Sequence, residues 1–206
     1  MKDIKEIRFV ATNYFNLQGL KNVAIGIFGI LVVLWGNKLK YPMSMQSWII
    51  LGLVVVVSMA IYFGFDRYYL HNFGKVKLTV ESKRLEWLVG IFCLILVIAA
   101  FWLKSSYKLP PISILGLVFG IGLLADYIRI TWLVKGRHLL YYPIGVVLAI
   151  VLSLLPLLGL PQWWKLVGLR SEALGIGLFM GLFSIFAGIW GHSYLVRTLS
   201  PKTEEK

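Results

Sequence analysis

The sequence predicts an all-α, polytopic integral membrane protein whose six transmembrane helices form one bundle. Two observations support this prediction. Hydrophobic residues make up 59% of the chain and charged residues only 15%, a composition outside the range of soluble globular domains. The eighteen residues from Trp48 to Phe65 carry no charge. At about 1.5 Å rise per residue they reach roughly 27 Å, which is close to the hydrocarbon thickness of a bilayer.

Six apolar stretches of this kind are the expected spans. They cover residues 17–35, 46–65, 85–103, 112–130, 139–160 and 172–191. The connections between them are too short to hold a folded domain, so residues 1–206 are expected to form a single transmembrane domain. The second, fourth and sixth spans each end in a polar residue followed by an arginine. This pattern fits three parallel helical hairpins, but the topology of any six-span protein explains it as well.

Single residues refine the first and fifth spans. Lys21 lies close to the start of the first span, where we expect it to snorkel toward the headgroups. Residues 1–16 place apolar side chains at helical spacing and predict a short interfacial helix. The fifth stretch contains Pro143 and Pro156. Its helix is therefore expected to start near the first proline and to bend or end at the second.

Residues 66–86 form the longest polar connection and are expected to be a basic loop on the cytoplasmic side. Within it, residues 75–81 alternate polar and apolar side chains in the manner of a strand. The basic side chains suit anionic lipid headgroups or a partner protein. Enforcing the topology is the simpler role for this loop, and the two roles are compatible.

Basic residues are distributed unequally between the two sides of the predicted spans. The side with both termini and the connections 66–86 and 126–138 carries 15 lysines and arginines, and the opposite side carries the remaining six of the 21. By the positive-inside rule both termini face the cytoplasm, in a cell membrane. This distribution also accounts for the net charge of +12, so nucleic acid is not an expected partner.

Small residues predict where helices approach closely. In the sixth span they recur every three or four residues, as Gly177, Gly181, Ser184, Gly188 and Gly191. Helices in lipid associate through close van der Waals contact, so this stripe predicts a packing seam, and His192 continues it. Similar pairs are Ala60 with Gly64 in the second span and Gly116 with Gly120 in the fourth. The even-numbered spans are therefore expected to form the inner set.

Polar residues gather where the even-numbered spans reach the cytoplasmic side. This candidate rim comprises Asp66, Arg67, Asp126, Arg129, His192 and Arg197. The helix macrodipole disfavours negative charge at a helix C-terminus, so both aspartates need cationic partners. Arg129 lies on the same face as Asp126, and Asp66 is expected to pair with an arginine of a neighbouring hairpin. We interpret the rim first as bundle-closing ion pairs, with acid–base work on a lipid headgroup as the alternative.

The sequence contains no recognisable catalytic or cofactor motif. It has no phosphate-binding P-loop, no HExxH and no CxxC, and its histidines match no compact metal signature. Cys93 is the single cysteine, which excludes an intrachain disulfide. No acidic or basic residue falls in the middle of a span, as ion-driven carriers usually require. We therefore expect no cofactor and no metal.

Three functions of different class remain open at this stage. The first is a structural, regulatory or accessory subunit of a membrane assembly, which binds the lipid bilayer and either its own copies or a membrane partner protein. The second is a small permease or channel-like component that works as an oligomer or with a separate ATPase. The third is an intramembrane enzyme that modifies lipid at the cytoplasmic rim. The absence of a midplane polar site and of a catalytic set favours the first, non-enzymatic role.

Overall fold

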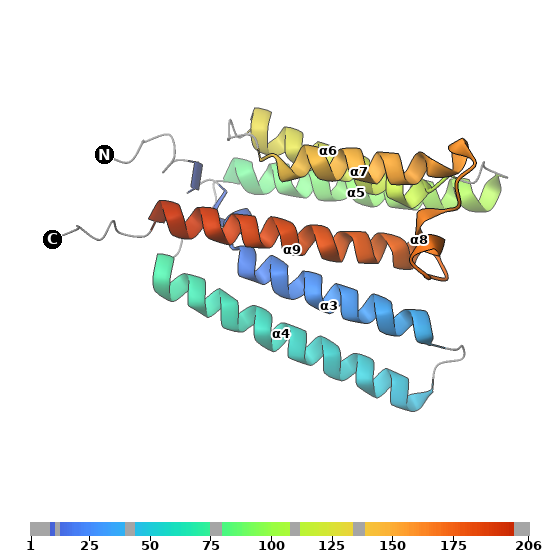
Figure 1. Cartoon of the computed structure of the whole chain (residues 1–206). Coiled ribbons are helices and arrows are strands. Elements are labelled where there is room, and N and C mark those ends of the chain that lie inside the picture. Colours follow the sequence, from blue (N-terminus) through green and yellow to red (C-terminus); the bar gives the residue numbers. More distant parts are fainter. Residues whose placement is uncertain are drawn as a thin grey trace. The chain divides into compact units, whose positions relative to one another are not determined.

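The computed structural model of the chain describes residues 9–10, 13–39, 44–74, 80–107, 112–133 and 139–199, and all regular structure among them is helical (Figure 1). The six long helices are α3 (Gly19–Lys38), α4 (Met45–Phe73), α5 (Val80–Ser106), α6 (Ile114–Ile128), α7 (Tyr141–Leu154) and α9 (Glu172–Leu199). The shorter elements are α2 (Tyr14–Leu17), the π-helix η1 (Arg129–Leu133), the 3-10 helix η2 (Leu155–Leu158) and α8 (Trp163–Leu166). With η1 continuing α6 and η2 continuing α7, the described residues contain six helices that are long and apolar enough to cross a membrane. The prediction of an all-helical, multi-pass membrane protein is confirmed.

The chain divides into two compact units. The first unit comprises Met1–Val32, Leu39–Lys77 and Gly181–Lys206, and so contains α2, α4, most of α3 and the C-terminal part of α9. The second unit comprises Val33–Lys38 and Leu78–Met180, and so contains α5, α6, η1, α7, η2, α8 and the remaining ends of α3 and α9.

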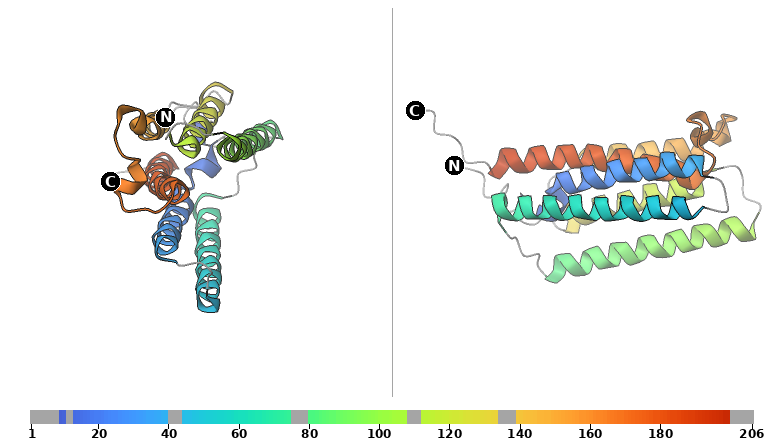
Figure 2. Two further views of the ribbon diagram at one scale, coloured as in Figure 1. Left: turned by 90° about the vertical axis from the view of Figure 1, so that its right-hand side faces the viewer. Right: turned by 90° about the horizontal axis from the view of Figure 1, so that it is seen from below.

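In the first unit α3 lies alongside α9 (Figures 1 and 2). Gly19 faces Gly188 and Gly26 faces Gly181, so the two helices run antiparallel. A Cβ atom on Gly26 would lie 2.5 Å from the carbonyl oxygen of Gly181, and one on Gly188 would lie 2.5 Å from that of Gly19. On each of the two helices these glycines are seven residues apart, which is the repeat of left-handed helix pairs. Without Cβ atoms the backbones approach closely enough for the dispersion contacts that hold helices together in lipid.

The partner of this glycine seam differs from the prediction. Gly181, Gly188 and Gly191 face α3 and the residues just before it, and Gly177 faces Val33 within the second unit. Ser184, the fifth position of the predicted stripe, is half-buried. The partner is thus the first span, and the expectation of an inner set of even-numbered spans is wrong for the second. Small-residue spacing identifies a face, but it does not identify the helix that packs there.

Helix α4 extends well past the end of its apolar run. It begins after the N-cap Ser44, continues through Asp66 and ends at Gly74, which has a φ of 76° that glycine adopts without steric strain. Helix α5 then starts at Val80. Most of the predicted loop 66–86 is therefore helical, because charges mark where a helix leaves the hydrocarbon and not where its hydrogen bonding stops. Residues 75–79, the larger part of the predicted strand-like segment, lie outside the described residues.

In the second unit α6 packs against α7 through its glycines. A Cβ atom on Gly120 would meet Ile150 at 3.3 Å and Ala149 at 3.4 Å, while one on Gly116 would clash with the hydroxyl of Ser153. Helix α7 ends at Leu154, and Pro156 lies in η2. This agrees with the bend or end predicted at that proline. The predicted small-residue face of the fourth span therefore packs on the fifth.

The C-terminal end of α3 is held by the segment after α8. Asn37 donates from Nδ2 to the carbonyl of Gly168 at 2.9 Å and accepts from the backbone N–H of Arg170 at 2.9 Å. The Arg170 guanidinium donates to the carbonyl of Gly36 at 2.8 Å. A cation that binds the last carbonyls of a helix also complements its macrodipole. Beneath this clamp the core contains Val33, Trp163, Trp164 and Leu169.

Candidate functional site

The six predicted rim residues fall into the two units. The first unit contains Asp66, Arg67, His192 and Arg197, and the second contains Asp126 and Arg129. Arg67 and Arg197 are exposed, whereas the other four take part in polar contacts within their own unit.

In the first unit the partner of Asp66 is Lys21. The ammonium of Lys21 forms an ion pair with Asp66 Oδ1, and it also lies 5.1 Å from the centre of the Tyr62 ring. The Lys21 side chain is 7% exposed and that of Asp66 is 40% exposed. Two predictions are thus wrong: Lys21 does not snorkel to the surface, and Asp66 does not pair with an arginine. The four-carbon stem of lysine bridges α3 to α4, where the carboxylate offsets the desolvation of the ammonium.

Tyr69 joins three helices of the first unit. Its hydroxyl accepts a hydrogen bond from the backbone N–H of Leu20 at 3.0 Å and lies 2.9 Å from His192 Nδ1. The tautomer of His192 decides which of these two atoms donates, because Nδ1 accepts from the phenol in one neutral tautomer and donates to it in the other. His192 lies on the seam, as its spacing predicts.

Helix α2 contacts the same region of the first unit through Tyr14. The hydroxyl of Tyr14 lies 3.1 Å from the carbonyl oxygens of both Tyr69 and Gly74. Burial raises the pKa of the Tyr14 phenol above its usual value, so it stays protonated and remains a donor. Sequence reasoning missed Tyr14 and Tyr69 and did not find the partner of Lys21, because these contacts depend on the register between helices.

In the second unit Arg129 lies between two carboxylates. Its Nε donates to Asp126 Oδ1 at 2.8 Å, which confirms the predicted pair, and its Nη1 lies 3.3 Å from Glu86 Oε1. The hydroxyl of Tyr142 donates to Asp126 Oδ2 at 2.5 Å. The Arg129 side chain is buried and opens the π-helix η1, an irregularity often found at functional sites. Sequence reasoning missed Glu86 and Tyr142, which α5 and α7 bring to this cluster.

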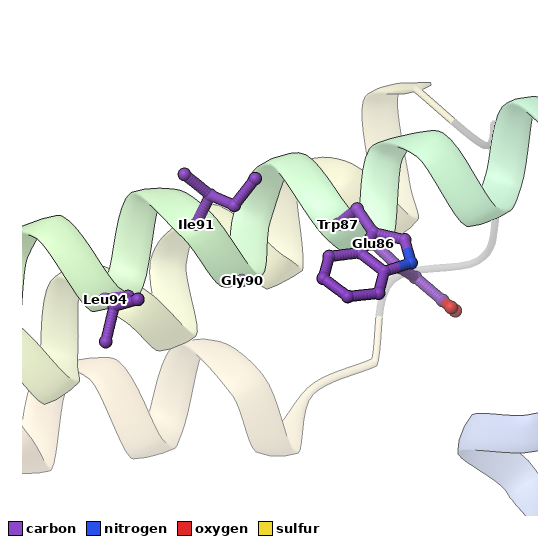
Figure 3. A pocket seen from close by; sticks show the side chains of 5 residues that line it. All are labelled: Glu86, Trp87, Gly90, Ile91 and Leu94. Atoms are coloured by element: carbon purple, nitrogen blue, oxygen red, sulfur yellow. The ribbon is translucent and has the colours of Figure 1, made fainter.

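An open groove of about 560 Å³ begins at this cluster and follows one face of α5. Figure 3 shows its lining, with Glu86 and Trp87 at one end and Leu94 at the other. Gly90 and Ile91 lie between them, one helical turn further along the chain from Glu86 and Trp87. The groove therefore combines one carboxylate end with an apolar floor.

A third cluster forms around Glu172, in the first turn of α9. Its buried Oε1 accepts from the Ser113 hydroxyl and from the Leu115 N–H, each at 2.9 Å, and its Oε2 forms an ion pair with Lys104. Ser113 is the N-cap of α6. The carboxylate thus lies at the positive ends of two helix dipoles. The sequence offered one signal, an acidic residue in a first helical turn, but not its partners.

Taken cluster by cluster, the buried charges are neutralised by opposite charges. Lys21, Arg129 and Glu172 are each buried and each paired. Among the described residues no three histidine, cysteine, aspartate or glutamate side chains are placed to hold a metal ion. His71 is exposed and Cys93 is half-buried, and His138 lies outside the described residues. The ion pairs and hydrogen bonds of these clusters are suited to holding neighbouring helices of each unit together.

Comparison with protein-family models, with curated proteins and with solved structures yields no match for this chain.

Proposed function

We propose that this chain is a structural or accessory subunit of an assembly in the cell membrane, and that its α4 helix packs against a transmembrane helix of another protein chain. The observation that carries this proposal is the lack of packing along α4. The helix has 29 residues, of which only Tyr69, near its C-terminal end, is buried among the residues whose burial is described. None of its most apolar stretch is buried.

The glycines of α4 support contact with another helix more than contact with lipid alone. A Cβ atom placed at Gly52 or Gly64 would meet nothing within 4 Å. Glycine lowers helix propensity by up to about 1 kcal/mol and contributes no apolar surface toward lipid. In membranes, small residues favour association because they let a second helix approach closely. A partner helix could pack closely against α4 at these two glycines.

The engaged carboxylates of three acidic residues support a non-enzymatic role. A general acid or base needs a proton that it can exchange with a substrate, and a nucleophile needs an adjacent base. The carboxylates of Asp66, Asp126 and Glu172 are instead engaged by lysine, arginine, tyrosine or serine donors. This arrangement favours a scaffold over the lipid-modifying enzyme that the rim alone also allowed.

The orientation we propose places both termini in the cytoplasm. An even number of crossings leaves both ends of a chain on one side of the membrane. The side with both termini carries 15 of the 21 basic residues. The positive-inside rule assigns that side to the cytoplasm.

Native mass spectrometry tests the proposal. The full chain, extracted from its own membranes in mild detergent, is expected to retain a second protein chain, which is either another copy or a different membrane protein. Masses that correspond only to the single chain, across several mild detergents, would contradict the proposal.

Photo-cross-linking then tests the interface. A photoreactive residue at Val56 of α4, whose side chain is 66% exposed, is expected to cross-link to the partner. Val147 of α7 is the matched control, because it is also valine and is 58% exposed on a spanning helix. Equal yields of cross-linked protein from the two positions would argue against α4 as the interface.

A further inference from the structure

The groove along α5 has the dimensions of a short length of lipid tail. It runs from Glu86 to Leu94, which is about 12 Å at 1.5 Å per residue. The Trp87, Ile91 and Leu94 side chains on this face are all exposed. On a helix that crosses a bilayer such side chains contact acyl chains, so the occupant of the groove is taken from the membrane.

The polar end of the groove carries a negative charge that its neighbouring cation does not fully neutralise. Glu86 and Asp126 share the single guanidinium of Arg129, so these three side chains carry a net charge of −1. Both Asp126 oxygens are occupied, by Arg129 and by Tyr142. Glu86 uses only Oε1, and within the described part of the chain its Oε2 has no hydrogen-bond partner. A cation with N–H donors could form a charge-assisted hydrogen bond with this second carboxylate oxygen.

A positive charge lies on the same helix face, one turn toward the N-terminus of α5. Lys83 precedes Glu86 by three residues and Trp87 by four, so the three side chains are neighbours on the helix surface. Lys83 is exposed and forms no ion pair with the described residues. A carboxylate and an ammonium thus stand side by side at the mouth of an apolar groove, which matches a headgroup that carries both charges.

We propose that this groove binds a phospholipid whose headgroup bears a primary ammonium, of the phosphatidylethanolamine class. The lipid ammonium donates to Glu86 Oε2, the phosphate pairs with Lys83, and one acyl chain lies along Trp87, Ile91 and Leu94. A choline headgroup has no N–H to donate, and a glycerol headgroup has no positive charge for Glu86. The site therefore distinguishes phospholipids by headgroup. This inference does not depend on the proposed subunit role.

Lipid retention tests the site. The full chain is placed in nanodiscs that contain equal amounts of phosphatidylethanolamine, phosphatidylcholine and phosphatidylglycerol with identical acyl chains. Bound lipids are then counted by native mass spectrometry after release from the nanodisc. We expect phosphatidylethanolamine to be retained about threefold over each of the other two, the size expected of one partly exposed ion pair. Equal retention of the three lipids, or preference for another of them, would overturn the proposal.

Two substitutions test whether the preference for phosphatidylethanolamine arises in this groove. Glu86→Gln removes the negative charge, and Gly90→Leu fills the groove at a position where an added Cβ meets nothing within 4 Å. Both are expected to abolish the preference. Gly29→Leu is the matched control, because Gly29 also has open space around it, and it should keep the preference. Glu86→Gln keeps the size of the side chain, and Arg129 retains its ion pair with Asp126, so this variant tests the proposal even if Gly90→Leu impairs folding. A preference that survives Glu86→Gln would overturn the proposal.

Discussion

The two members of the Lys21–Asp66 pair are shielded from solvent to different extents, and this asymmetry predicts unequal mutational effects. Asp66→Asn leaves a buried ammonium without its counter-ion, while Lys21→Met leaves a carboxylate that is 40% exposed to solvent. We expect Asp66→Asn to lower the free energy of unfolding by about 2 kcal/mol and Lys21→Met by about 1 kcal/mol or less. Denaturant titration in detergent micelles measures both values. Equal losses would contradict the asymmetry.

The hydroxyl of Tyr69 is a second residue-scale determinant of stability. Tyr69→Phe removes the acceptor for the Leu20 N–H and the hydrogen-bond partner of His192 Nδ1, near the contact between the helices. We expect a loss of about 1–3 kcal/mol in the free energy of unfolding. The neighbouring Tyr68→Phe is the control, because Tyr68 is exposed, and its effect should be within about 0.5 kcal/mol of zero.

At the scale of elements, glycines in different settings should respond in opposite directions to alanine. Gly26→Ala and Gly188→Ala place a Cβ atom 2.5 Å from a backbone oxygen of the facing helix, so α3 and α9 must move apart. We expect a loss of about 1–3 kcal/mol in the free energy of unfolding for each. Gly52→Ala and Gly64→Ala meet no neighbour and should be neutral or raise stability by up to about 1 kcal/mol. Thermal unfolding in one detergent compares all four variants.

The start of α6 depends on a residue of α9. Glu172→Gln keeps one acceptor for the Leu115 N–H and the Ser113 hydroxyl but removes the charge that faces Lys104 and the helix dipoles. We expect a loss of about 1–2 kcal/mol in the free energy of unfolding. Lys104→Met should have a smaller effect, because Lys104 is half exposed and leaves Glu172 with its two other donors. A larger effect of Lys104→Met would contradict this account.

For the whole molecule, apolar length and charge placement were enough to predict six spanning helices, since these properties are local. The pair Asp126–Arg129 was predictable for the same reason, as both residues lie within one turn. The partner of Asp66 and the helix facing Gly181 and Gly188 were not predictable. Both depend on which spans are neighbours, and neither periodicity nor composition carries that information. Glu86 and Tyr142 were missed because each reaches its cluster from another helix.

The orientation of the six helices can be tested with introduced cysteines, because Cys93 is the only native one and Cys93→Ser gives a cysteine-free background. Met45 is the first residue of the second spanning helix and Leu158 is the last residue of the fifth, and both are exposed. If both termini are cytoplasmic, cysteines at these two positions face outward and react with a membrane-impermeant maleimide in intact cells. A cysteine at His71, which is exposed near the end of α4, faces inward and reacts only after the cells are permeabilised. The reverse labelling pattern would place both termini outside, and it would mean that basic residues do not set the orientation of this chain.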